Sequence, residues 1–180
     1  MTQEQIKQLV ERYPFLIPRN VWTGKILENY DYTYMIGWGL PDGWHRLFLQ
    51  MCEDIRQPLI DADYLEQFRF SQVKEKYNRM CLYNFGAPKA VDEILSKYEM
   101  MAGYVCTKCG KPAVYETRDY IASYCEDCWK DMGLAEKAKV IEFKPYYKRT
   151  NWGTGGKLSE IISFEEEWNR YLKGLEGENV

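Results

Sequence analysis

The apolar and polar positions of this chain change between helical and strand-like spacing, which is typical of an α+β fold. Apolar residues three or four positions apart predict four helices, over residues 2–13, 40–57, 88–102 and 163–173. Alternation with period two predicts strands at 30–38, 68–74 and 80–84, and shorter strands at 113–116, 120–124 and 139–143. Residues 76–79 are the expected turn between the second and third strands, because Asn78 tolerates a left-handed backbone.

Proline, glycine and capping residues set the expected boundaries of these elements. Pro58 is expected to mark the end of the second helix, and Gly103 lies at the end of the third. A helical turn is predicted at 129–132, with Gly133 as its stop. Ser163 with Glu166 forms a capping box that opens the last helix, after which residues 174–180 are expected to fray.

The strongest candidate chemistry is a pair of C-x-x-C motifs, Cys106–Cys109 and Cys125–Cys128. Fifteen residues separate the two pairs, which is the spacing of a closed tetrahedral zinc site. Four thiolates leave no open coordination position, so the motif predicts a structural Zn²⁺ rather than zinc catalysis. Metal binding then contributes on the order of 10 kcal/mol to folding at neutral pH.

The six cysteines also allow a disulfide framework, but the polar amino terminus has no apolar core of a signal peptide. No apolar run approaches the roughly 20 residues of a membrane span. We therefore expect a cytoplasmic protein with a metal site. Cys52 and Cys81, outside the motifs, are interpreted as small buried hydrophobic residues.

The bulk composition predicts one compact domain, or one domain with a small appendage. The chain has 180 residues with 46% hydrophobic and 16% aromatic content, enough for a substantial core. The predicted fold class is α+β, with short helices and a β-hairpin body and an inserted or appended four-cysteine zinc ribbon. The body is expected at residues 1–103, the ribbon at 104–133, and a basic and aromatic segment with a C-terminal helix that packs on the body at 134–180.

The middle of the chain resembles a known family. Residues 72–83 read QVKEKYNRMCLY and are followed by Cys106-Thr-Lys-Cys-Gly-Lys-Pro112, with Asp42-Gly-Trp44 upstream. This arrangement resembles the QxKEKFGxLRxY segment and CxxCGxP element of small zinc-ribbon proteins found in bacterial genomes, phages and prophages. The likeness covers residues 40–130. The family's turn glycine is Asn78 here, and its Leu-Arg pair is Met80-Cys81.

The resemblance implies an accessory protein without chemistry of its own, located in a bacterial host cell. Such proteins act by binding a host or phage protein complex. A specific form of this hypothesis is an inhibitor of a defence nuclease, similar to an anti-CRISPR protein. The residues themselves offer no acid–base pair that favours an enzyme: His45 is the single histidine, and it is interpreted as structural. Residues 153–157 are similar to a phosphate loop only superficially, because the Walker pattern is broken at Asn151 and Leu158.

Five acidic residues gather around the end of the second predicted helix: Glu53, Asp54, Asp61, Asp63 and Glu66. Three interpretations stay open. They form a solvated face, a Mg²⁺ site of carboxylates, or an acidic surface that binds a basic groove as a nucleic-acid mimic does.

The segment 136–157 carries six basic residues against two acidic ones. Its candidate contact residues for nucleic acid or a protein partner are Lys144, Tyr146, Tyr147, Lys148, Arg149 and Trp152. Cations with interleaved rings suit single-stranded nucleic acid, so direct nucleic-acid binding is the alternative function. A solvated strand with core aromatics is the simpler explanation, and the net charge of −3 argues against a general affinity for nucleic acid.

Overall fold

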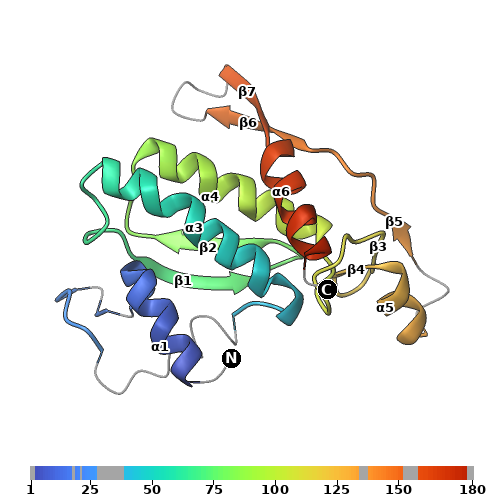
Figure 1. Cartoon of the computed structure of the whole chain (residues 1–180). Coiled ribbons are helices and arrows are strands. Elements are labelled where there is room, and N and C mark those ends of the chain that lie inside the picture. The colour runs from blue at the N-terminus through green and yellow to red at the C-terminus, as the bar shows by residue number, and fades with distance from the viewer. Residues whose placement is uncertain are drawn as a thin grey trace.

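The computed structural model describes residues 3–17, 19–20, 22–27, 39–133, 138–151 and 158–177. It confirms an α+β architecture of helices and small antiparallel sheets (Figure 1). The helices are α1 (Gln3–Arg12), α3 (His45–Asp61), α4 (Lys89–Met101), α5 (Glu126–Asp131) and α6 (Glu165–Glu176). The strands are β1 (Phe70–Glu75), β2 (Met80–Asn84), β3 (Tyr115–Glu116), β4 (Ser123–Tyr124), β5 (Lys139–Val140), β6 (Tyr146–Asn151) and β7 (Leu158–Ser163). The strand expected at 30–38 lies outside the described residues.

The body of the molecule is a layer of two helices packed on the β1–β2 hairpin. Figure 1 shows α3 and α4 side by side across this hairpin, with α1 at the β1 edge of the hairpin. The apolar stripes that predict these helices face the core, where Trp44, Phe48 and Tyr98 are fully buried. Phe15, in a 3₁₀ turn after α1, packs its ring on Phe68 at a centroid distance of 5.8 Å.

The β1–β2 turn confirms the expected left-handed backbone. The Lys76 and Arg79 backbones exchange hydrogen bonds of 2.9 and 3.1 Å, and Tyr77 and Asn78 between them have φ of 52° and 61°. Two consecutive positive φ angles define the type I′ turn, which matches the right-handed twist of a hairpin. The turn therefore places a tyrosine where asparagine, aspartate or glycine is usual.

The four cysteines lie in a small unit beside this body, called the ribbon here and comprising residues 104–133. Its strands β3 and β4 pair antiparallel, and β5 from the following segment adds to the other edge of β3. Helix α5 follows β4 directly, and Gly133 ends this unit with φ of 65° as predicted.

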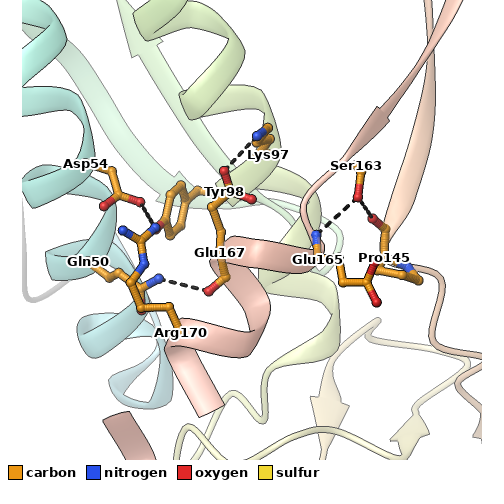
Figure 2. Close-up of polar contacts among 9 residues, drawn as sticks. All are labelled: Gln50, Asp54, Lys97, Tyr98, Pro145, Ser163, Glu165, Glu167 and Arg170. Carbon is orange, nitrogen blue, oxygen red and sulfur yellow. Dashed lines mark hydrogen bonds and ion pairs between the residues drawn. The ribbon is translucent and has the colours of Figure 1, made fainter. Parts of the chain in front are cut away.

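The last part of the chain returns to the body as the β6–β7 hairpin and α6 (Figure 1). Figure 2 shows the polar contacts that hold α6 against α3 and α4. The Asp54 carboxylate accepts hydrogen bonds from the Tyr98 hydroxyl and the Arg170 guanidinium. The Gln50 side chain donates to the Glu167 carbonyl, and Lys97 forms an ion pair of 2.6 Å with the Glu167 carboxylate.

Several predicted boundaries are wrong. The second helix begins at His45 rather than at 40, after the 3₁₀ turn Asp42–Trp44, and the strands predicted from 113 and 120 begin at Tyr115 and Ser123. Helix α3 continues through Pro58 to Asp61, because a proline in the last turn removes one donor while its own carbonyl still accepts the Ala62 N–H. Helix α5 begins at Glu126 rather than at 129, with Cys125 as its N-cap. The strand expected at 139–143 ends at Val140, where its pairing with β3 stops.

The last helix also differs from its prediction. Its N-cap residue is Phe164, although the Ser163 hydroxyl still accepts the Glu165 N–H at 3.3 Å and donates to the Pro145 carbonyl (Figure 2). The helix extends to Glu176 instead of fraying from 174, because the Gly174 carbonyl accepts a hydrogen bond from Arg46 of α3. Across the described residues, no helix has the length and apolar character that a bilayer crossing requires.

Candidate metal centre

The four predicted ligands converge on one point of the ribbon. The Sγ atoms of Cys106, Cys109, Cys125 and Cys128 all lie within 4.8 Å of one another. Cys109 Sγ is 3.5 Å from Cys125 Sγ. Three of these cysteines are buried and Cys109 is exposed. The folded chain thus brings both C-x-x-C pairs together as the spacing predicted.

The sulfur positions fit a tetrahedral metal ion. Zinc with Zn–S bonds of about 2.3 Å places its ligands about 3.8 Å apart, close to the separations seen here. Four cysteines are the donor set of closed structural zinc sites. The cluster is therefore compatible with a zinc-binding site, in which all four positions are filled by protein sulfur.

The surroundings of the sulfur atoms affect their protonation unequally. Burial acts to raise the pKa of Cys106, but backbone groups of Cys125, Cys109 and Lys108 outweigh it, so the pKa lies below its ordinary value. Burial raises the pKa of Cys109 to about 11 and also raises that of Cys128. Four thiolates at this separation repel one another, and a divalent cation removes that repulsion, which favours a bound metal.

The first knuckle, residues 106–110, is held by the residues that precede α3. The Gly43 N–H donates to the Thr107 carbonyl at 3.0 Å, and the Trp44 indole N–H donates to the Val105 carbonyl at 3.1 Å. A Cβ at Gly43 would overlap the Cys106 carbonyl and lie 2.6 Å from the Gly110 nitrogen. Only glycine allows this approach of the two backbones.

Two further contacts attach the ribbon to the body from other sides. The Tyr171 hydroxyl of α6 donates to the Gly110 carbonyl at 2.6 Å, and Gly110 itself has φ of 81°. From the β1–β2 turn, the Asn78 side-chain amide donates to the Ser123 hydroxyl at 2.5 Å. That hydroxyl donates in turn to the Gly103 carbonyl at 2.7 Å. The metal centre is therefore part of the packing of the whole molecule.

The second knuckle, Cys125 to Cys128, is built at the start of α5, and both of its cysteines are buried. Trp129, next to Cys128, is buried against the rings of Tyr115 and Tyr124 at 5.2 and 6.1 Å. Lys111, directly after the first knuckle, pairs with Asp127 at 3.0 Å across the exposed face. Aromatic packing on one side and an exposed ion pair on the other thus hold the second knuckle in place.

The acidic residues near the end of α3 do not gather into a second cluster of ligands in the described part of the chain. Within the described part of the chain, the four cysteines are the one group of three or more potential ligands close enough to share an ion. Glu53 instead accepts hydrogen bonds from Arg12 and Tyr13, and Asp54 from Tyr98 and Arg170. These contacts keep the pKa of Glu53 below its usual value, the Tyr13 hydrogen bond being the largest cause.

The candidate contact residues of the last segment divide between two faces of β6. Tyr147 and Arg149 are half-buried towards the body, where Arg149 pairs with Glu160 of β7 and Glu93 of α4. Tyr146 and Lys148 are exposed on the other face. Lys144 pairs with Glu142 at 2.9 Å, and Trp152 lies outside the described residues. Much of the positive charge counted in the sequence is therefore matched by carboxylates.

Sequence reasoning identified the ligands but not the residues that fix them to the body. Tyr171 was predicted only as part of a helix, and Asn78 only as a turn residue. A signal was present in Asp42-Gly-Trp44, part of the family-like pattern, because Gly43 and Trp44 both contact the first knuckle. Comparisons with models of known protein families, with curated protein sequences and with solved structures found no match for this chain.

Proposed function

We propose that this chain is a non-catalytic zinc-ribbon protein that binds a protein, or a protein–nucleic-acid complex, of a bacterial host cell. The single observation that carries the proposal is the closed set of four sulfur atoms within 4.8 Å, built into the packing of the body. A site of this kind gives zinc no position for substrate or water, so the metal acts as a structural element.

The position of the ribbon supports a role in presenting a surface. Gly43, Tyr171 and Asn78 reach it from the start of α3, from α6 and from the β1–β2 turn. Zinc that organises the ribbon therefore also fixes how these three parts of the body lie relative to one another. A rigid surface loses little entropy on binding, which favours recognition of a protein partner.

The proposed origin and partner are based on two segments of the sequence. These are the family-like segment at residues 72–83 and the C-x-x-C element at 106–112. Their resemblance to small zinc-ribbon proteins of phages and prophages supports a phage or prophage origin. It also supports a host complex as the partner. Inhibition of a defence nuclease, in the manner of an anti-CRISPR protein, is the narrowest form of the proposal and rests on this resemblance.

Direct binding of nucleic acid is the second candidate, favoured by the exposed Tyr146 and Lys148 on the outer face of β6. Three other cations of this region argue against nucleic-acid binding, because each already pairs with a carboxylate: Lys139, Lys144 and Arg149. Since counterion release drives nucleic-acid affinity, cations that already have carboxylate partners contribute less to it.

The proposal is tested with purified protein in three measurements. Metal analysis should give about one zinc per chain. Tagged protein should capture a reproducible partner from a bacterial lysate, and that partner, purified separately, should bind directly in calorimetry. A fluorescent twenty-nucleotide oligothymidine should show no salt-sensitive binding at moderate ionic strength.

Oligonucleotide binding that weakens steeply with salt, and that Lys148→Glu with Arg149→Glu reduces, would establish the second candidate instead. A partner that fails to bind once purified would remove the interaction proposal. Zinc content near zero in a folded protein would overturn the structural role of the metal.

A further inference from the structure

A groove lies where the ribbon meets the end of β1, beside the metal centre. Its volume is about 760 Å³, within the range of sites that hold small ligands or several residues of a peptide. One side is formed by residues 39–41 and the end of β1, and the other by residues 120–124 of the ribbon. Its apolar lining includes Leu40, Pro41, Ile121, Ala122 and Met132.

Tyr120 spans the two sides of this groove. Its side chain is 75% exposed, yet its hydroxyl donates to the Glu75 carboxylate of β1 at 3.3 Å. Tyr120, Tyr124 and Met132 also line a second hollow of about 320 Å³ on the same ribbon loop. An exposed tyrosine held in position by a hydrogen bond is a pre-organised contact residue of the type enriched at protein interfaces.

The neighbouring turn carries a second exposed ring that the fold does not require. Tyr77 is 72% exposed and has φ of 52°, at a position where glycine, asparagine or aspartate is favoured. A bulky residue in this conformation is strained, and its ring stays in water. Among the described residues its ring contact is with the Lys76 ammonium at 5.5 Å. Strain and exposure together indicate recognition rather than stability.

The charge at this end of β1 is positive. Among the described residues, Lys74 and Lys76 form no ion pair, and the Lys74 ammonium lies 5.2 Å from the centre of the Tyr83 ring. The acid between them, Glu75, has both carboxylate oxygens engaged, by the Asn78 N–H and by the Tyr120 hydroxyl. An acidic group on a partner therefore meets two cations that pair with no carboxylate of the described residues.

We infer that this groove docks an extended acidic segment of the partner protein. An aliphatic side chain of the segment enters the apolar part of the groove, beside Tyr120, and flanking carboxylates pair with Lys74 and Lys76. This inference rests on the proposed function and names the surface and the partner chemistry. Most of the apolar lining is aliphatic, which suits a peptide side chain. Tyr120 and Tyr124 also present ring faces on which a base can stack, so oligonucleotide binding is measured as the competing outcome.

The chain itself offers a matched pair of variants. The groove variant combines Lys74→Glu with Tyr120→Ala, and the control variant combines Lys148→Glu with Tyr146→Ala on the outer face of β6. Both make the same changes of charge and ring, and Tyr146 is also exposed, at 49%. Circular dichroism and zinc content should be the same for both variants and the unmodified protein, because neither change touches a cysteine or a core residue.

The probe is a displayed library of random ten-residue peptides, selected on the zinc-loaded protein. We expect enrichment of peptides with one aliphatic residue flanked by aspartate or glutamate. A synthetic copy of the strongest one should bind the groove variant about 30-fold more weakly, and the control variant within about 2-fold of the unmodified protein. Selection of basic peptides, equal binding to the groove variant, or no selected peptide would overturn the groove assignment.

Binding of the captured host partner to the two variants tests the proposed function and the groove assignment separately. A partner that binds both variants equally leaves the proposed function standing and removes the groove. Loss of the partner with the groove variant alone supports both. Salt-sensitive binding of the oligothymidine that the groove variant abolishes would assign this surface to nucleic acid and overturn the peptide.

Discussion

The ribbon and the β6–β7 hairpin both lie beside the same helical body, but they are attached to it in different ways. The ribbon is joined by backbone contacts and buried hydrogen bonds that involve Gly43, Trp44 and Tyr171. The β6–β7 hairpin is attached by the half-buried Tyr147, which packs against the core, and by the partly exposed ion pair of Arg149 with Glu93 of α4. Buried and satisfied hydrogen bonds cost more to break than solvent-exposed ion pairs.

This difference indicates which part of the molecule sets its stability. Loss of the ribbon structure exposes Trp44 and leaves buried backbone groups without partners, so the body is weakened with it. Opening of the β6–β7 hairpin returns charged side chains to water at little cost and exposes one half-buried ring, that of Tyr147. We therefore expect the ribbon and body to unfold together, and the hairpin to open independently.

The largest effect is expected from loss of the metal centre. Cys125→Ser removes one of four ligands, and zinc binding contributes on the order of 10 kcal/mol, comparable to the whole stability of a small domain. We expect no cooperative thermal unfolding transition in this variant, measured by calorimetry. Excess chelator should have the same effect on the unmodified protein.

The matched control for that prediction is Cys81→Ser, which changes a cysteine of β2 outside the cluster. It should alter the free energy of unfolding by about 1 kcal/mol or less and keep the zinc content. A Cys125→Ser protein that unfolds with normal cooperativity would show that the ribbon and the body are not coupled.

The next effect tests the close approach of the body to the first knuckle. In Gly43→Ala the new methyl group overlaps the Cys106 carbonyl oxygen and lies too close to the Gly110 nitrogen. Both are backbone atoms, which cannot rotate away as a side chain can. We expect a loss of about 3 kcal/mol in the free energy of unfolding, measured by urea denaturation.

Gly177→Ala is the control for this change, because a Cβ there meets backbone oxygens at 3.8 and 3.9 Å, which is ordinary contact. Its stability should stay within about 0.5 kcal/mol of the unmodified protein. Equal stability of the two variants would mean that the knuckle moves freely relative to the start of α3.

The sequence predicted what depends on local pattern. The stripe of α4, the left-handed Asn78 and the four cysteines each follow from spacing within a short stretch, and the structure confirms them. It did not predict β7, and it predicted a solvated strand in the segment of β6 without its bounds, since mixed charges and rings give no clear period in this stretch. Nor did it predict the roles of Gly43 and Tyr171, since their partners lie more than sixty residues away.

A smaller effect tests one hydrogen bond of the ribbon. Tyr171→Phe keeps the buried ring and removes the hydroxyl that donates to the Gly110 carbonyl. We expect a loss of about 1–2 kcal/mol, because the carbonyl stays buried without its partner. Tyr146→Phe, at an exposed position, should change stability by less than about 0.5 kcal/mol. Equal values for both would show that water replaces the lost hydroxyl at Gly110.

The smallest effect is expected at the β6–β7 hairpin. Arg149→Gln removes the ion pairs with Glu160 and Glu93, which solvent screens, so the loss should be about 0.5–1 kcal/mol and should shrink at high salt. Hydrogen exchange of the hairpin amides should accelerate while exchange in α3 stays unchanged. Lys148→Gln, on the outer face of the same strand, is the control and should leave both unchanged. A loss of about 3 kcal/mol or more with Arg149→Gln, accompanied by faster exchange in α3, would mean that the hairpin is as integral to the fold as the ribbon.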